Sequence, residues 1–149
     1  MSITERLNND LKEALRSGDD NRKSVIRLLL AALKNQQIEN RAPLDYQQEL
    51  SVLQREAKRR KESIEEYERL GRPDVAEKER RELEIIQSYL PAEMSEEEIR
   101  QIVAQAILTT GAQSSKDLGK VMSVVMPQVR GRADGKIVSN LAKEMLENS

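Results

Sequence analysis

Residues 64–76 read IEEYERLGRPDVA, and this stretch decides the fold expected for the middle of the chain. Its first half continues a charge-rich helical pattern that starts near Leu44, and Gly71 is the residue type that most often ends a helix. Pro73 is suited to the first turn of a helix that runs back. The sequence therefore predicts a projecting antiparallel helical hairpin over residues 44–90, apolar at its base and charged towards its tip.

Two helices are expected before this hairpin. Ser2 opens the first with a capping box in which Glu5 reaches back to the backbone, and Gly18 ends it. The second runs from the aspartates after Gly18 to the break at residues 40–43. Because it is apolar around much of its circumference, we expect it to be the most buried helix of the chain.

The junction Leu90-Pro91-Ala92 is the expected domain boundary, with an N-terminal helical domain over residues 1–91 and a small C-terminal helical domain over residues 92–149. Three helices are expected beyond it: one after a second capping box at Ser95, a short one that Pro127 closes or kinks, and a last one that ends near Glu147. No segment shows the alternation of a half-buried strand, so the predicted fold class is all-α.

The amino-acid composition favours helices and excludes several classes of protein. The 149 residues include no Phe, no Trp and three Tyr, while 34% are charged, so aliphatic side chains must form a thin core. The absence of Cys excludes disulfides and thiolate chemistry. The start of the chain lacks the apolar stretch of a secretory signal, and no apolar run approaches the length of a membrane span. We therefore expect a cytoplasmic protein with no membrane partner.

Independent catalysis is not expected. The chain has no His and no Cys, so the commonest general base and the commonest metal ligands are missing. It contains neither a Walker-type phosphate-binding loop nor a GxGxxG motif. Ser114-Ser115-Lys116 offers the residue types of a Ser–Lys nucleophile, but these serines stand where a helix needs a cap. The sequence predicts no catalytic residue, no cofactor and no metal site.

Two basic features remain as candidate binding sites. Residues 58–61, Lys-Arg-Arg-Lys, lie in the charged hairpin and are either a solvated helix face or a contact for a partner protein or RNA. Between Ser114 and Lys143, six bases and two acids give a local charge of +4 in a chain of net charge −1. This second region is either a tight turn between helices, with arginines that are simply solvated, or a site that binds an anion or an RNA backbone. Its candidate residues are Lys116, Lys120, Arg130, Arg132 and Lys136.

The residues of this region also resemble a known family. KDLGKVM over residues 116–122, then Met126-Pro127 and GRADGK over residues 131–136, resemble the YqeY family. The junction at residues 89–92 before an acidic helix start, and the Arg-Leu-Leu run at residues 27–29, are similar to that family too. The resemblance covers essentially the whole chain.

The resemblance implies a kinship with tRNA-dependent amide transfer. The C-terminal part of the family is similar to the tail domain of the B subunit of the glutamine-dependent Asp/Glu-tRNA amidotransferase, an all-helical module that helps to engage tRNA. The catalytic domains of that enzyme lie elsewhere. Contact with the tRNA backbone is implied for the bases that match the tail motif: Lys116, Lys120, Arg130, Arg132 and Lys136. Close packing and turn geometry are implied for the matching glycines: Gly119, Gly131 and Gly135.

Three functions therefore stay open at this point. The first is a tRNA-binding accessory protein that has no catalytic site of its own. The second is a protein-interaction module that docks through the charged hairpin at residues 44–90. The third is a component of an amidotransferase, a carbon–nitrogen ligase with glutamine as amido-N donor, that acts only in an assembly.

Overall fold

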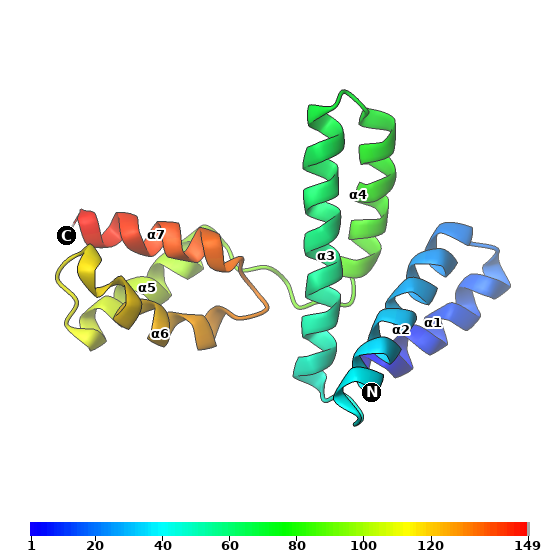
Figure 1. Cartoon of the computed structure of the whole chain (residues 1–149), viewed down its shortest axis with the longest axis horizontal. Coiled ribbons are helices and arrows are strands. Elements are labelled where there is room, and N and C mark those ends of the chain that lie inside the picture. The colour runs from blue at the N-terminus through cyan, green and yellow to red at the C-terminus, as the bar shows by residue number, and fades with distance from the viewer. Residues whose placement is uncertain (149) are drawn as a thin grey trace. The chain divides into compact units, whose positions relative to one another are not determined.

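The computed structural model describes residues 1–148, which form seven α-helices, one short 3-10 helix and no strand (Figure 1). The prediction of an all-α fold is confirmed. In chain order the elements are α1 (Ile3–Ser17), α2 (Asp20–Asn40), α3 (Tyr46–Arg69), α4 (Pro73–Gln87), α5 (Glu96–Thr110), the 3-10 helix η1 (Ser115–Asp117), α6 (Leu118–Val129) and α7 (Gly135–Glu147). They divide into two compact units, Met1–Pro91 and a second unit that starts at Ala92.

The first unit is built from two antiparallel pairs of helices. α1 packs along α2, and α3 packs along α4, which follows it after a short turn (Figure 1). The largest fully buried side chains of this unit are aliphatic: Ile3, Leu7, Ile26, Leu29, Leu53 and Ile86. The expectation that α2 is the most buried helix is wrong, because seven residues of α3 are buried and only four of α2. The core covers one side of α2 and leaves Ile38 65% exposed on the other.

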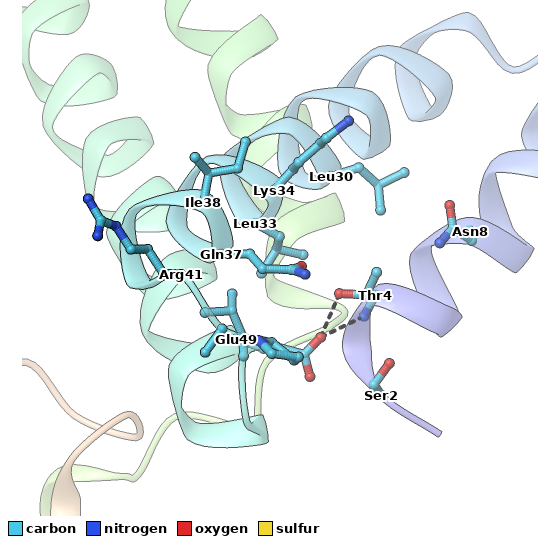
Figure 2. Close-up of a pocket in the computed structure, with 13 residues that line it drawn as sticks. Ser2, Thr4, Asn8, Leu30, Leu33, Lys34, Gln37, Ile38, Arg41 and Glu49 are labelled. Atoms are coloured by element: carbon cyan, nitrogen blue, oxygen red, sulfur yellow. Dashed lines mark hydrogen bonds between the residues drawn. The ribbon is translucent and has the colours of Figure 1, made fainter.

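A buried carboxylate holds the start of α1 against α3. Glu49 is 3% exposed, and it accepts hydrogen bonds from the backbone N–H groups of Ile3 and Thr4 at 3.3 and 2.9 Å. The Thr4 hydroxyl donates to the same carboxylate at 2.6 Å (Figure 2). The Ser2 hydroxyl caps α1 as predicted, but in the described part of the chain Glu5 does not reach back to it. A tertiary contact therefore satisfies the N–H groups of the first two helical residues and places a negative charge at the positive end of the helix dipole.

A second long-range contact ties the end of the first unit to its start. The hydroxyl of Tyr89, a residue that is only 3% exposed, donates to the carboxylate of Asp10 in α1. The guanidinium of Arg22 lies 3.5 Å from the same carboxylate, and that of Arg6 lies 5.0 Å from the centre of the Tyr89 ring. Burial, and then the hydrogen bond to Asp10, raise the pKa of Tyr89 above its usual value of 10.0. The only buried aromatic ring among the described residues thus ties the segment after α4 to α1 and, through Asp10, to Arg22 of α2.

The helical pair α3–α4 encloses an ion cluster between its two helices. The side chain of Arg60 is 11% exposed, and its guanidinium lies 3.0 Å from Glu56, 3.4 Å from Glu82 and 3.8 Å from Glu79. Glu56 belongs to α3, while Glu79 and Glu82 belong to α4. Arg60 therefore links the two helices in place of an apolar side chain at that level of the seam.

The second unit is a core of three helices, α5, α6 and α7, that pack against one another (Figure 1). Its fully buried side chains are largely valines: Val103, Val121, Val125, Val129 and Val138. Pro127, the predicted end or kink of α6, lies inside the helix, which continues to Val129. Proline near the last turn removes a single backbone donor, and the N–H of Arg130 still donates to the carbonyl of Met126 at 2.9 Å.

The contact of Glu49 with α1 predicts a large effect on stability. Glu49→Ala leaves two backbone N–H groups and a hydroxyl without their acceptor, so the free energy of unfolding in urea should fall by roughly 2–3 kcal/mol. Glu5→Ala is the matched control because Glu5 is exposed, and it should change stability by less than about 0.5 kcal/mol. Equal losses in the two variants would show that Glu49 does not hold α1.

Tyr89 predicts a loss of stability at high pH. Its pKa is raised in the folded protein, so the hydroxyl stabilises the fold fully below pH 10 and this contribution disappears as the pH rises through the raised pKa. Tyr89→Phe should therefore be less stable than the wild type by about 1–2 kcal/mol at pH 7, and the difference should shrink above pH 10. Thermal melts at pH 7–11 measure this. Tyr46→Phe is the control, since the Tyr46 side chain is half exposed, and a constant gap for Tyr89→Phe would contradict the prediction.

The second unit predicts that a fragment of residues 92–149 folds alone. Its core is formed entirely by side chains between Met94 and Leu146. The isolated fragment should give a helical circular dichroism spectrum and a cooperative melt, although a piece of this size is expected to be only marginally stable. A coil-like spectrum would show that the division at Ala92 does not separate independent domains.

Candidate nucleic-acid interface

The first group of predicted residues lies where η1 leads into α6. The Ser114 hydroxyl caps η1 by accepting the N–H of Lys116 at 3.3 Å, and the Lys116 side chain is exposed. Asp117 accepts the backbone N–H of Gln113 at 2.9 Å. That bond, and to a smaller extent the charge of Lys120, lower the pKa of Asp117. Asp117 is therefore ionised at neutral pH, and this end of α6 carries two exposed lysines beside one carboxylate.

The second group lies in the turn between α6 and α7. Arg130 follows the last residue of α6 and is exposed, and Gly131 makes the turn with a left-handed φ of 84°. The carboxylate of Asp134 caps α7 by accepting the N–H of Lys136 at 2.9 Å, as the sequence predicts. The Lys136 side chain is exposed in the first turn of α7, where a cation opposes the helix dipole. Folding gives no reason for a base at that position.

Arg132 is in a different situation from the other four predicted residues. Its Nε donates to the carbonyl of Ala92 at 3.2 Å, and its guanidinium lies 3.8 Å from the carboxylate of Glu98. The Arg132 carbonyl in turn accepts the N–H of Met94 at 2.8 Å. Arg132 therefore fixes the segment before α5 to the α6–α7 turn. No local pattern connects residues so far apart in the chain, so this role could not be predicted from the sequence.

The five predicted residues do not converge on one point. Lys120 and Arg130 are ten residues apart on or beside one helix, which separates them by about 15 Å along its axis. Within residues 1–148, no ion pair is formed by the four bases other than Arg132: Lys116, Lys120, Arg130 and Lys136. The unit thus presents two pairs of unpaired exposed bases at the two ends of α6.

The three glycines of this region have different surroundings. A Cβ at Gly135 would lie 3.4 Å from the Cε of Met126, so Gly135 permits close packing of α7 on α6. Gly131 supplies the left-handed turn. A Cβ at Gly119 would meet no atom within 4 Å, so the close packing implied for this glycine is not found.

At the alternative site, residues 58–61, both arginines are already engaged by glutamates in the fold. Arg60 is enclosed by the glutamates of the α3–α4 pair, and Arg59 lies 3.5 Å from Glu56. Lys58 is exposed, so it is the base of this group that is most available to a partner. Among the described residues, no group of three or more acidic side chains is arranged to hold a metal ion. None of the described helices is long and apolar enough to span a bilayer.

Comparison with known proteins gives matches along nearly the whole chain. The family model described as Yqey-like protein matches residues 4–146. A protein of Pyrenophora tritici-repentis is 33% identical over an alignment that covers 97% of this chain and 81% of the relative. A protein of Kluyveromyces lactis is 35% identical, with 87% and 68% covered. One of Eremothecium gossypii is 39% identical over 58% of this chain, and the match spans about half, 48%, of that relative.

These relatives correct the expected location. All three carry the name Altered inheritance of mitochondria protein 41, mitochondrial, so the prediction of a cytoplasmic protein is wrong by this comparison. The features behind that prediction, a lack of cysteine and of long apolar runs, are equally compatible with a protein inside an organelle. They report on redox state and membrane insertion, and they do not separate one aqueous compartment from another.

The family itself is settled by the extent of the match. The Yqey-like model covers 143 positions, from residue 4 to residue 146, and includes both units of the fold. The relative from Pyrenophora tritici-repentis aligns over the same two units. The resemblance seen in the sequence is thereby confirmed, and the chain belongs to the YqeY family.

Proposed function

We propose that this protein is a tRNA-binding accessory factor, related to the tail domain of the B subunit of the glutamine-dependent Asp/Glu-tRNA amidotransferase. The observation that carries the proposal is the set of unpaired exposed bases at the two ends of α6: Lys116, Lys120, Arg130 and Lys136. The net charge of −1 provides no general attraction to RNA, so a local arrangement of this kind is required.

The arrangement suits contact with the phosphate backbone. Lysine and arginine side chains pair with phosphates without reading the bases, and such contacts position a protein on RNA. The separation of about 15 Å along α6 lets the two pairs of bases touch two stretches of backbone of a folded RNA. All three tyrosines precede Ala92, so the C-terminal unit has no aromatic ring on which a base would stack. Recognition therefore depends on the shape and charge of the RNA.

The link to amide transfer is a proposal about the assembly and not about a reaction of this chain. The likeness concerns the tail module, and the chain supplies none of the amidase or kinase-like domains of the amidotransferase. Its role in such an assembly is to hold tRNA. Docking through the α3–α4 hairpin is less well supported, because Arg60 is enclosed between the helices and Arg59 is paired with Glu56.

Titration of the full chain with fluorescently labelled total tRNA tests the proposal. If four phosphates are neutralised, affinity should fall by roughly 100-fold between 50 and 200 mM salt. A four-base variant with Lys116→Gln, Lys120→Gln, Arg130→Gln and Lys136→Gln should lose most of the affinity at 50 mM and nearly all of the salt dependence. Each half of the variant should remove about half of the salt slope.

A control variant separates a local site from a general charge effect. Lys12→Gln, Lys58→Gln, Arg72→Gln and Lys78→Gln change four exposed bases of the first unit and give the same net charge. This control should bind tRNA as the wild type does. Equal weakening by both variants, or no binding of the wild type at 50 mM salt, would contradict the proposal. Arg132 is left unchanged because its bonds to Ala92 and Glu98 stabilise the unit.

A further inference from the structure

The exposed side of α2 carries bases at a regular spacing. Arg27, Lys34 and Arg41 are each seven residues apart, and Ala31 and Ile38 fall between them on the same face. At 3.6 residues per turn, seven residues are close to two full turns, so Arg27 and Lys34 project along one line about 10.5 Å apart, and Arg41 directly follows the last residue of the helix. We call these five residues the α2 stripe. It lies on the side of the helix opposite Val25 and Leu29, which are buried.

The bases of the α2 stripe have no partner within the described chain. All three are exposed, and over residues 1–148 none of them forms an ion pair. By contrast, Arg22 at the start of α2 lies 3.5 Å from Asp10, and Lys23 lies 3.3 Å from Asp20. An aliphatic side chain that is 65% exposed, Ile38, lies between two of the unpaired bases. This combination of charge and exposed apolar surface is typical of a surface that contacts another protein.

A pocket opens beside the C-terminal end of the stripe. Its cavity volume is about 770 Å³, and it lies between the start of α1, the end of α2 and the loop that leads to α3 (Figure 2). Leu30, Leu33 and Ile38 give it apolar walls, while Lys34 and Arg41 extend outward from it. The Glu49 carboxylate also lines the pocket, and its oxygens face the start of α1, where they accept hydrogen bonds from Ile3 and Thr4. The volume is in the range of functional binding pockets.

Arg41 occupies a backbone position that folding alone does not favour for arginine. Its φ is 56°, the left-handed conformation that ends a helix and that glycine or asparagine adopts most easily. A side chain with a Cβ is disfavoured there by about 1–2 kcal/mol. Among the described non-glycine residues, Arg41 alone has a positive φ. Over residues 1–148 its guanidinium forms no ion pair that would offset this strain, which fits a side chain retained for binding.

We propose that the α2 stripe and the adjacent pocket bind an acidic amphipathic helix of a partner protein. The partner places an apolar side chain in the pocket and small or apolar residues over Ala31 and Ile38. Its carboxylates, also seven residues apart, pair with Arg27, Lys34 and Arg41, as charged flanks pair between the helices of a coiled coil. RNA fits this surface less well, because phosphates gain nothing from the exposed Ile38 or from the leucine walls of the pocket.

Two synthetic peptides of 21 residues test the proposal on the full chain. The acidic probe has leucine at the two core positions of each heptad and glutamate at the two flanking positions, and the basic probe has lysine in place of every glutamate. Like charges keep each probe from pairing with itself. The acidic probe should bind with a dissociation constant of about 10 μM at 50 mM salt. Because it can form three exposed ion pairs with the stripe, it should bind about tenfold more tightly than the basic probe.

Variants of the stripe distinguish the effect of its own charges from the effect of the protein's net charge. The triple reversal R27E/K34E/R41E should invert the preference between the probes, whereas the control K58E/K78E/K143E, with the same change in net charge, should keep the wild-type order. Arg41→Gly should weaken the acidic probe about threefold without lowering the melting temperature, because glycine relieves the left-handed strain.

Three results would overturn the proposal. These are equal binding of the two probes, no binding of the acidic probe, and an order of preference that the triple reversal leaves unchanged. The same variants are titrated with total tRNA. If the triple reversal abolishes tRNA binding and leaves peptide binding unchanged, the stripe is an RNA contact instead. Because the stripe is separate from the four bases around α6, failure here leaves the test of tRNA binding at those bases intact.

Discussion

The buried carboxylate of Glu49 is the interaction on which the arrangement of the first unit depends. It binds the free N–H groups at the start of α1 from the first turn of α3, so it joins two segments that are 45 residues apart in the chain. The core of the same unit covers one side of α2 and leaves Ile38 exposed on the other. The Glu49 contact forms one wall of the pocket beside the α2 stripe. An interaction that stabilises the fold therefore also shapes a surface that is open to a partner.

Both cores of the chain consist largely of aliphatic side chains, because the sequence contains no Phe and no Trp. Valine, leucine and isoleucine bury less area per residue than Phe or Trp, and each core therefore relies on polar contacts at its edges. In the first unit Tyr89 closes the core by its bond to Asp10. In the second, Arg132 binds the carbonyl of Ala92 and fixes the entry to α5. These polar contacts stabilise the edges of cores that consist largely of small and medium-sized aliphatic side chains.

The sequence predicted the helices well because their signals are local. Gly18, Gly71 and Gly111 each follow the last turn of a helix and have positive φ, and Asp134 caps α7 as expected. The failures concern contacts between distant residues. Nothing near Ile3 and Thr4 indicates that Glu49 accepts their N–H groups, and nothing near Arg132 indicates its bond to Ala92. Of the candidate site, the exposure of four bases was predictable from their positions in turns and first helical turns, whereas the distance between their two groups required the fold.

The arginines of this chain show how a binding role is separated from a structural one. Arg60 lies among three glutamates and Arg132 against a carbonyl and a carboxylate, so each has a reason to be present in the folded chain. Arg41 has no such partner in the part of the chain that the structure describes, and it adopts a backbone conformation that glycine would adopt at lower free energy. Backbone strain reduces the stability of a fold, and an exposed side chain that forms no ion pair over residues 1–148 does not offset that cost. A residue that shows both in one place, next to a pocket, is best explained by a contact made with another molecule.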